Sequence, residues 1–350
     1  MSPFLTYKAS KEGGTMSQTV VLTGISGFIA KHIALKLLAS GHSVRGSLRD
    51  LSRAGEVRTA LAPLLGETAL TRLSFVQLDL TSDDNWAAAM TGATALIHSA
   101  SPFPIANPQD ENDLIRPAVE GTQRAITAAA AAGIRRVILT SSVAAIIDTY
   151  KRGMQDETDW CNLDDPDTTA YAKSKTMAER AAWAVAVPHG MALTTINPGL
   201  VIGPPLDGNY GSSISIVARL LRARDPMLPM ISFTCVDVRD VAEAHLRALE
   251  RPETAGRRIP CTAGIMSMPD MARVLKAAYP ARRITSRVAP KFVLRLLAMF
   301  DPDIRAILPS LGQAHHVSNG RARKDLDMRF ISPEGALRAS AEWLVENGRV

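Results

Sequence analysis

The stretch Thr19-Val-Val-Leu-Thr-Gly-Ile-Ser-Gly-Phe-Ile-Ala30 decides the fold of this chain. Its first five residues are apolar or β-branched and predict a buried strand, and the apolar pattern over 28–39 predicts a helix. Between them, Gly24 permits a tight turn, Gly27 allows close backbone approach, and Ala30 is small enough for helix–strand packing. A strand, a glycine turn and a helix N-terminus in this order are typical of a pyrophosphate site. We therefore predict a dinucleotide-binding turn over 24–29.

Apolar runs and helical patterns continue to alternate along the chain up to residue 200. Strands joined by helices of this length pair in parallel through right-handed crossovers. The sequence thus predicts an α/β fold with a doubly wound parallel sheet of the Rossmann type. The further strands are expected over 43–48, 73–80, 93–98, 136–140 and 193–197, and the further helices over 53–65, 110–132 and 168–187.

The alternation ends after Pro198, where proline and glycine crowd residues 198–211. The remainder reads as mostly helical, with one strand near 258–262. We expect 16–200 to form the dinucleotide-binding domain, with 231–263 returning to it. Residues 201–230 and 264–350 are expected to form a smaller, mostly helical C-terminal substrate lobe. Residues 1–15 are polar and patternless, and we expect a disordered extension there.

Composition narrows the class of protein. The 350 residues are 46% apolar, enough for a sizeable core. The net charge is +6, but the arginine pairs are scattered and aromatic residues make up only 5%, so no basic stripe with stacking residues indicates nucleic-acid binding. No apolar run reaches the roughly 18–20 residues of a membrane span, and glycines interrupt the one stretch that resembles a signal peptide. A cytoplasmic protein without a membrane partner is expected.

The three cysteines, Cys161, Cys235 and Cys261, are odd in number and far apart in the chain. This spacing argues against a disulfide framework and against a zinc site. His98 ends a predicted strand, and no histidine spacing suggests a metal. We expect reduced thiols and no metal.

The residues at the end of the second predicted strand, Arg49-Asp50-Leu-Ser-Arg53, indicate whether NAD or NADP binds. Arg49 is suited to pair with a 2′-phosphate and to stack on adenine, which favours NADP, whereas Asp50 keeps NAD open as an alternative. Asp79 and Leu80 end the third strand and suit the adenine edge. Asp79 as a helix N-cap is the alternative.

Tyr171 and Lys175 are four residues apart on a predicted helix and so lie on one face, and Ser142 follows a predicted strand. Tyr7 and Lys11 share that spacing but lie in the patternless N-terminal segment. Taken singly, each side chain has an ordinary structural explanation: helix packing for Tyr171, a solvated surface residue for Lys175 and a backbone hydrogen bond for Ser142. Because all three follow an ordered series of strands and helices, we predict that together they form a proton-donating site. Ser142 would fix a carbonyl oxygen and Tyr171 would protonate it. The charge of Lys175 should lower the tyrosine pKa from about 10.

These stretches together resemble the extended short-chain dehydrogenase/reductase family, and within it the dihydroflavonol-reductase-like NADPH-dependent carbonyl reductases. The matching segments are 23–29, 44–50, 98–102, 111–122, 137–142, 171–175, 197–204, 236–245 and 317–326, in family order over nearly the whole chain after residue 16. The resemblance implies reduction of a ketone or aldehyde to an alcohol by hydride from NADPH, with Tyr171 as proton donor and Ser142, Tyr171 and Lys175 as the catalytic triad. It implies cofactor contacts from Gly24, Ile25, Ser26, Gly27, Phe28, Ile29, Arg49, Asp79, Leu80, Ser99, Ala100, Ser101, Tyr171, Lys175, Pro198, Gly199, Leu200 and Val201.

Two positions depart from the family pattern. Glu120 stands where many relatives have an asparagine, which puts an asparagine-anchored proton-relay water in doubt, and Ala30 replaces the third glycine. Relatives often dimerise through the two long helices, here 110–132 and 168–187, so a homodimer is a possible assembly.

Several alternatives remain open. Within the same superfamily these are an NAD-dependent nucleotide-sugar epimerase or dehydratase and a hydroxysteroid dehydrogenase; outside it, a non-catalytic NADP-binding regulator. The carbonyl substrate is not identified by the sequence. An apolar or aromatic small molecule is expected, and the candidates for its pocket are Phe103, Ile105, Tyr210, Met227 and Met230.

Overall fold

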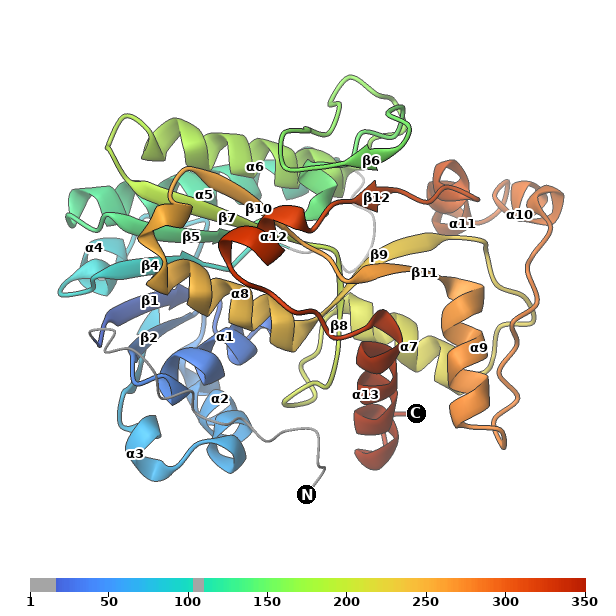
Figure 1. Ribbon diagram of the computed structural model, residues 1–350, viewed down its shortest axis with the longest axis horizontal. Helices are drawn as coiled ribbons and strands as arrows, with labels where there is room; N and C mark the ends of the chain where they lie inside the picture. The colour runs from blue at the N-terminus through green and yellow to red at the C-terminus, as the bar shows by residue number, and fades with distance from the viewer. Residues whose placement is uncertain (1–16, 103–109) are drawn as a thin grey trace.

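The computed structural model describes residues 17–102 and 110–350, so the expected N-terminal extension and the candidates Phe103 and Ile105 lie outside the described residues. Within the described ranges, the centre is a seven-stranded sheet in the order β10-β7-β5-β4-β1-β2-β3 (Figure 1), and every neighbouring pair is parallel. The strands are β1 Thr19–Thr23, β2 Ser43–Leu48, β3 Leu73–Gln77, β4 Ala95–His98, β5 Arg136–Thr140, β7 Ala192–Pro198 and β10 Arg257–Cys261.

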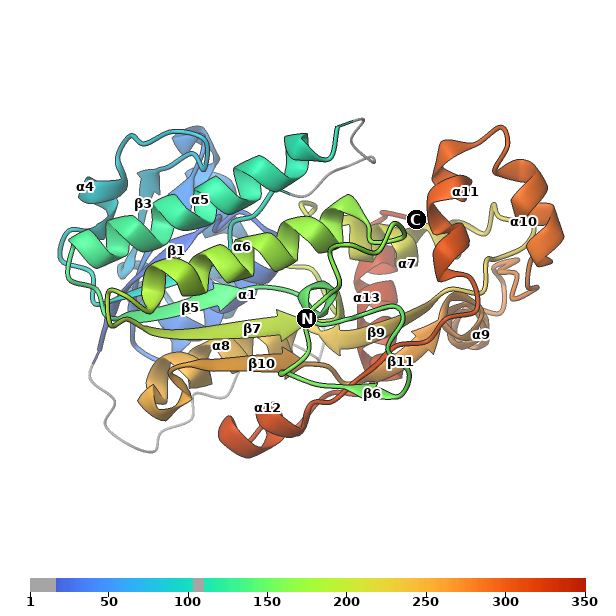
Figure 2. The same cartoon turned by 90° about the horizontal axis from the view of Figure 1, so that it is seen from above.

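Helices cover both faces of this sheet (Figure 2). One face carries α1 Phe28–Ala39 and α8 Val238–Glu250, and the other carries α4 Trp86–Met90, α5 Asn112–Ala131 and α6 Ala170–Ala186. Side chains of β1 alternate between them: Val20 and Leu22 join the core beneath α1, and Val21 joins the core beneath α5. Burial on both faces explains why the strands read as continuous apolar runs.

Most of the remaining elements extend the molecule beyond the carboxyl ends of the strands, on the right of Figure 1. Among the residues placed by the structure, β8 Leu200–Ile202, β9 Ser232–Asp237 and β11 Gly264–Ser267 form a three-stranded sheet, and β6 Met154–Gln155 pairs with β12 His316–Val317. The helices here are α7 Ser212–Arg222, α9 Met268–Ala278, α10 Lys291–Leu297, α11 Pro302–Ile307 and α13 Pro333–Glu346. The short helix α12 Gly320–Asp325 packs against β10, and α2 Ala54–Leu61 and α3 Glu67–Leu70 follow β2.

The prediction of a doubly wound parallel sheet with a helical C-terminal lobe is confirmed. The small strands of that lobe were not expected from the sequence. Within 231–263, α8 and β10 belong to the large sheet, whereas β9 pairs in the small one. The residue bounds of the two domains stay a prediction.

The order of strands places a switch point between β1 and β4, where the chain winds toward β2 on one side and toward β5 on the other. Connections diverge at the carboxyl ends of these two strands, which is where sheets of this type usually bind their ligands. The predicted cofactor and catalytic residues follow the carboxyl ends of β1, β2, β3, β4, β5 and β7, or begin α6.

Candidate active site

The turn after β1 has the geometry that the glycine pattern predicted. Gly24 has φ +69°, and a Cβ built there would come within 3.0 Å of the Cα and Cβ of Ala100. Gly27 caps α1 through its backbone, without a side-chain hydrogen bond. The start of the helix therefore presents backbone groups and its positive dipole end rather than a capping side chain, which fits a dinucleotide pyrophosphate.

A hydroxyl ties the two strands of the switch point together. Thr23 Oγ1 accepts hydrogen bonds from the amides of Ser99 and Ala100, each 3.0 Å long, so its own proton is directed to Nδ1 of His98, 2.8 Å away. Burial, helped by the nearby charge of Lys175, lowers the pKa of His98 to about 3, and the ring is neutral. His98 is therefore a structural residue that orients the Thr23 hydroxyl, and Thr23 holds the predicted contacts Ser99 and Ala100 beside the glycine turn.

The ends of β2 and β3 bring Arg49 and Asp79 together. The Asp50 carboxylate accepts from the Ser52 amide at 2.9 Å and caps a short turn of its own. Asp79 accepts from the amide and hydroxyl of Thr81, and these bonds, with a contribution from Arg49, lower its pKa. Asp79 thus caps a turn and not a helix, since the next helix begins only at Trp86. No carboxylate in the described part of the chain is ion-paired with Arg49.

Leu80 and the segment after β7 are held by close backbone and helix contacts. A Cβ on Gly121 of α5 would come within 2.8 Å of the Leu80 Cβ, so Leu80 packs directly on that helix. A Cβ on Gly199 would lie 2.1 Å from the Thr234 carbonyl oxygen, so only glycine fits there. Pro198 ends β7, and Leu200 and Val201 belong to β8.

A loop from the C-terminal lobe closes over the glycine turn, which the sequence did not predict. The buried ammonium of Lys31 on α1 is paired with Asp207, and the Asn209 side-chain amide donates to the Ser26 carbonyl at 2.8 Å. These contacts hold the cofactor turn from outside the large sheet. Lys31 lies four residues after Gly27, and only its position on the buried face of an otherwise apolar helix could have indicated a partner.

The predicted catalytic side chains meet at the ends of β5 and α6. Thr169 caps α6, with its hydroxyl accepting from the Ala172 amide at 3.2 Å, and so fixes the first turn, which carries Tyr171. The Ser142 side chain lies beside the Tyr171 phenol and acts to lower the pKa of that phenol. The Lys175 ammonium lies 5.9 Å from the centre of the Tyr171 ring. The structure thus brings Ser142, Tyr171 and Lys175 into one site.

One expectation about this site is wrong. Burial raises the pKa of the Tyr171 phenol above its usual value, and the hydrogen bond to Ser142 offsets only part of that increase. Burial likewise lowers the pKa of Lys175 to about 8, against the opposing effect of Glu179. Removal from water therefore dominates the pKa of both groups.

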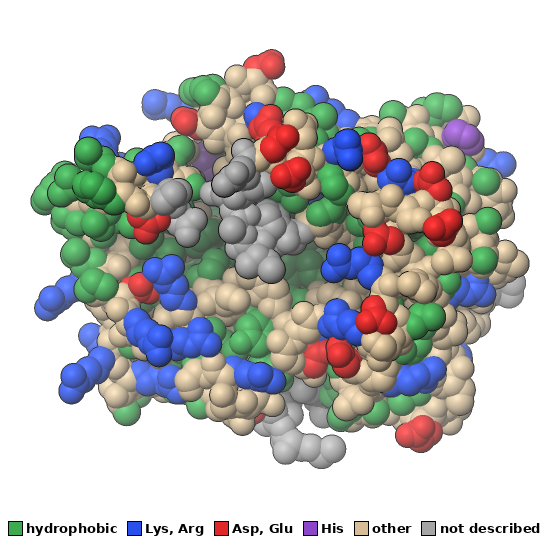
Figure 3. Space-filling model, turned by 180° about the vertical axis from the view of Figure 1, so that it is seen from behind, with side chains coloured by type: hydrophobic (Ala, Val, Ile, Leu, Met, Phe, Trp, Pro, Cys, Tyr) green, Lys and Arg blue, Asp and Glu red, His purple; other side chains and the backbone are tan. Residues whose placement is uncertain are grey.

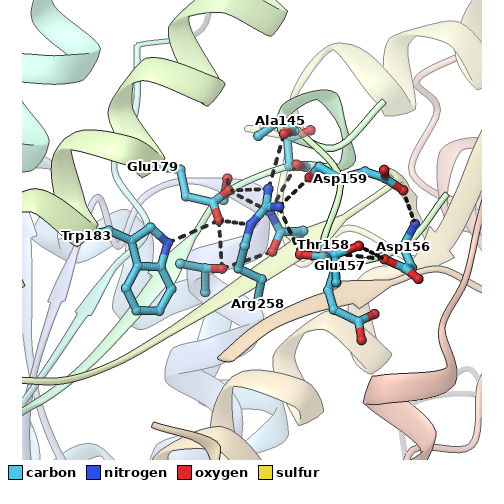
Figure 4. A network of polar contacts seen from close by, with 12 residues as sticks. Ala145, Asp156, Glu157, Thr158, Asp159, Glu179, Trp183 and Arg258 are labelled. Atoms are coloured by element: carbon cyan, nitrogen blue, oxygen red, sulfur yellow. Dashed lines mark hydrogen bonds and ion pairs between the residues drawn. The ribbon is translucent and has the colours of Figure 1, made fainter. Parts of the chain in front are cut away.

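Glu179 is a buried charge that the sequence analysis missed (Figure 4). Its Oε1 accepts from Arg258 Nε at 2.6 Å and from the Thr195 hydroxyl at 3.0 Å. Its Oε2 accepts from the Ser141 hydroxyl at 2.5 Å and from the Asn197 side-chain amide at 2.7 Å. Its spacing was the available signal, because Glu179 follows Lys175 by the same four residues that separate Lys175 from Tyr171.

Of the predicted substrate-pocket residues, the structure describes Tyr210, Met227 and Met230. The ring of Tyr210 packs edge-on against Trp343 of α13 at 5.9 Å, and Met227 and Met230 are exposed. Apolar side chains gather at the edge of the molecule that α10 and α11 form (Figure 3), where Phe292 and Phe300 are strongly exposed. The predicted pocket stays a prediction.

The remaining observations concern residues other than the predicted catalytic side chains. Glu120 is paired with Arg124 on the outer side of α5. A hollow of about 420 Å³ is lined by charged residues around Glu157 and Arg321 and by none of the predicted site residues. Among the described residues, His, Cys, Asp and Glu side chains form no cluster of three that suits a metal ion. In residues 17–102 and 110–350, no helix combines the length and apolar character needed to cross a bilayer.

The chain is similar to known proteins over most of its length. The family model described as "NAD dependent epimerase/dehydratase family" matches residues 20–260. Dihydroflavonol 4-reductase of Zea mays is 31% identical, over 79% of this chain and 78% of its own, and cinnamoyl-CoA reductase 1 of Oryza sativa subsp. japonica is 34% identical, over 80% and 82%. The structure of yeast methylglyoxal/isovaleraldehyde reductase Gre2 complexed with NADPH superposes with a TM-score of 0.77 at 26% identity, over 95% of this chain and all of that one.

Proposed function

We propose that this chain, which belongs to the NAD dependent epimerase/dehydratase family, is an NADPH-dependent reductase of ketones or aldehydes. The observation that carries the proposal is the placement of Ser142 and of the Lys175 ammonium beside the Tyr171 phenol, at the carboxyl edge of the parallel sheet. Similar proteins that carry the name reductase, at 31% and 34% identity, support the same activity.

The three side chains divide the acid–base work. Bound NADPH would supply the hydride to the carbonyl carbon. The Ser142 hydroxyl holds the carbonyl oxygen beside Tyr171, and the phenol gives its proton to the negative charge that develops on that oxygen. Because burial raises the pKa of Tyr171, the phenol carries its proton at neutral pH, the state that reduction requires. Lys175, protonated below about pH 8, then stabilises the phenolate.

The residues around the turn account for the choice of cofactor. The glycine turn and the first amides of α1 would bind the pyrophosphate, and Arg49 would bind a 2′-phosphate. The one acidic side chain at the end of β2, Asp50, is already engaged by the Ser52 amide, which weakens the argument for a ribose-gripping carboxylate and for NAD. These observations support NADPH.

The test is turnover of a carbonyl panel with NADPH and with NADH. Aldehydes, α-keto esters, aryl ketones and flavanonols cover the chemistry, and we expect reduction of at least one with NADPH. Tyr171→Phe should abolish that turnover while leaving NADPH binding, followed by its fluorescence, largely intact. Tyr150→Phe, at an exposed tyrosine, is the matched control and should keep wild-type activity. Full turnover in Tyr171→Phe would refute the assignment.

Other observations separate the alternatives. Tightly co-purified NAD would favour the epimerase, and oxidation of a steroid alcohol with NAD would favour the hydroxysteroid dehydrogenase. Binding of NADPH without turnover of any compound would favour the regulator. An apolar or aromatic substrate remains part of this proposal, with Tyr210, Met227 and Met230 as the described candidates for its pocket. The helices α5 and α6 lie side by side (Figure 2), which supports a homodimer through these two helices. Light scattering tests whether the protein has the mass of a dimer.

A further inference from the structure

Behind the three catalytic side chains lies a second layer of polar contacts that the proposed mechanism does not use. Resting on the proposed function, we propose that Glu179 is a positioning residue for the Lys175 ammonium and the Ser142 hydroxyl, and that Arg258 holds it in place. Glu179 touches no reacting atom. It acts through the two side chains whose places it determines.

The position of Glu179 on α6 couples it to Lys175. Tyr171, Lys175 and Glu179 follow one another at intervals of four residues, so they line one face of the helix. Lys175 and Glu179 are both buried there. Glu179 is the charged group that raises the pKa of Lys175 against the effect of burial. A carboxylate one turn away thus keeps the ammonium protonated at neutral pH.

The same carboxylate reaches the segment after β5 that carries Ser142. Its Oε2 accepts from the Ser141 hydroxyl at 2.5 Å and from Asn197 Nδ2 at 2.7 Å, and Asn197 Nδ2 also donates to the Ser142 carbonyl at 3.2 Å. The backbone on both sides of the Ser141–Ser142 peptide is therefore tied to α6 through Glu179. These bonds set the distance between the Ser142 hydroxyl and the phenol of Tyr171.

Arg258 keeps this buried carboxylate paired. Besides its bond to Glu179, its guanidinium donates to the backbone carbonyls of Ala145, at 3.1 Å, and of Glu157, at 3.0 Å, and also to that of Asp159 (Figure 4). It lies over the Trp160 ring, 3.7 Å from its centre. A planar group with several donors in fixed directions satisfies all these partners at once, which lysine would not do.

The other charged groups around Lys175 do not substitute for Glu179. His98 on β4 is neutral, because burial lowers its pKa to about 3. The acidic Glu111, which precedes α5, is paired with Lys173, 2.8 Å away. Tyr171 carries no charge at neutral pH, since burial raises its pKa. Among the described residues named here, Glu179 is therefore the negative charge that acts on Lys175.

The test follows NADPH affinity against pH by cofactor fluorescence, which needs no carbonyl substrate. In the wild type, affinity should fall as Lys175 loses its proton, above about pH 8. Glu179→Gln should move this fall to lower pH by about one unit, the size of shift that a nearby opposite charge causes. Glu179→Asp keeps the charge and should leave the fall at its wild-type pH, while its shorter side chain lowers kcat.

Asp237→Asn is the matched control, because it breaks another buried ion pair, with Arg239, outside this network. It should lower the melting temperature without moving the pH dependence. A Glu179→Gln protein with the wild-type pH dependence would overturn the proposal, as would an equal shift in Asp237→Asn. If Glu179→Gln does not fold, Glu179→Asp still tests the positioning role: a kcat equal to that of the wild type would overturn it, because the shorter side chain cannot keep the same contacts. Absence of carbonyl reduction by the wild type would instead refute the proposed function alone.

Discussion

Lys175 illustrates how the proposed active site lowers the stability of the free protein. Its ammonium is buried and its pKa falls to about 8, whereas in the unfolded chain it has the ordinary value of 10.5. Between these two values the unfolded chain binds more protons than the folded protein. Stability therefore rises with pH from about 8 to 10.5, and the full cost of the buried charge is present below pH 8.

The size of this cost follows from the two pKa values. A shift of 2.5 units, from 10.5 to about 8, at 1.36 kcal/mol per unit corresponds to about 3 kcal/mol at pH 7. Lys175→Met removes the charge and keeps a side chain of similar length. It also loses the contact with the Tyr171 ring, worth about 0.5–1 kcal/mol. We expect the variant to be more stable than the wild type by about 2 kcal/mol at pH 7.

The assay is urea unfolding of both proteins without cofactor, at pH 7 and at pH 9.5. The advantage of Lys175→Met should shrink by about 2 kcal/mol over this range, as the wild-type lysine becomes neutral in the folded state. Turnover should be lost at both pH values. Lys173→Met, next to it on α6 but paired with Glu111 at the surface, is the control and should show no such pH dependence. A Lys175→Met protein less stable than the wild type at pH 7 would show that the buried ammonium is not a cost.

Three further predictions concern the cofactor end and the fold. Arg49→Ala should weaken NADPH binding about tenfold or more and leave NADH binding unchanged, measured as dissociation constants by fluorescence; equal losses for both cofactors would contradict a role at the 2′-phosphate. Thr23→Val leaves two amides and His98 without their partner and should cost about 2–4 kcal/mol in urea unfolding, and a near-neutral result would contradict the hydrogen-bond assignment. Burial raises the pKa of Asp240 to about 7, so the folded protein binds more protons than the unfolded chain between about pH 4 and 7, and stability falls as pH rises. Asp240→Asn should therefore raise the melting temperature more at pH 8 than at pH 5; an equal change at both would refute the shift.

The sequence by itself determined the large sheet and the members of the proposed site. β1, α1, β2 and β5 begin and end at the residues that the pattern predicted, because apolar periodicity and glycine stops are local signals. Gly24 was identifiable because a left-handed turn after a strand favours that residue. Tyr171 and Lys175 were paired by the helical repeat alone.

The tertiary structure alone decided how that site is held together and how its groups titrate. Glu179 and Arg258 are 79 residues apart, and Thr23 and His98 are 75 apart, so no local pattern connects them; they meet because of the order in which parallel strands pair. The pKa of Tyr171 was expected to fall and instead rises, because its value depends on how much water the packed helices and strands exclude. Periodicity along a chain indicates which face a side chain occupies, but the partners and the solvent on that face come from segments distant in sequence.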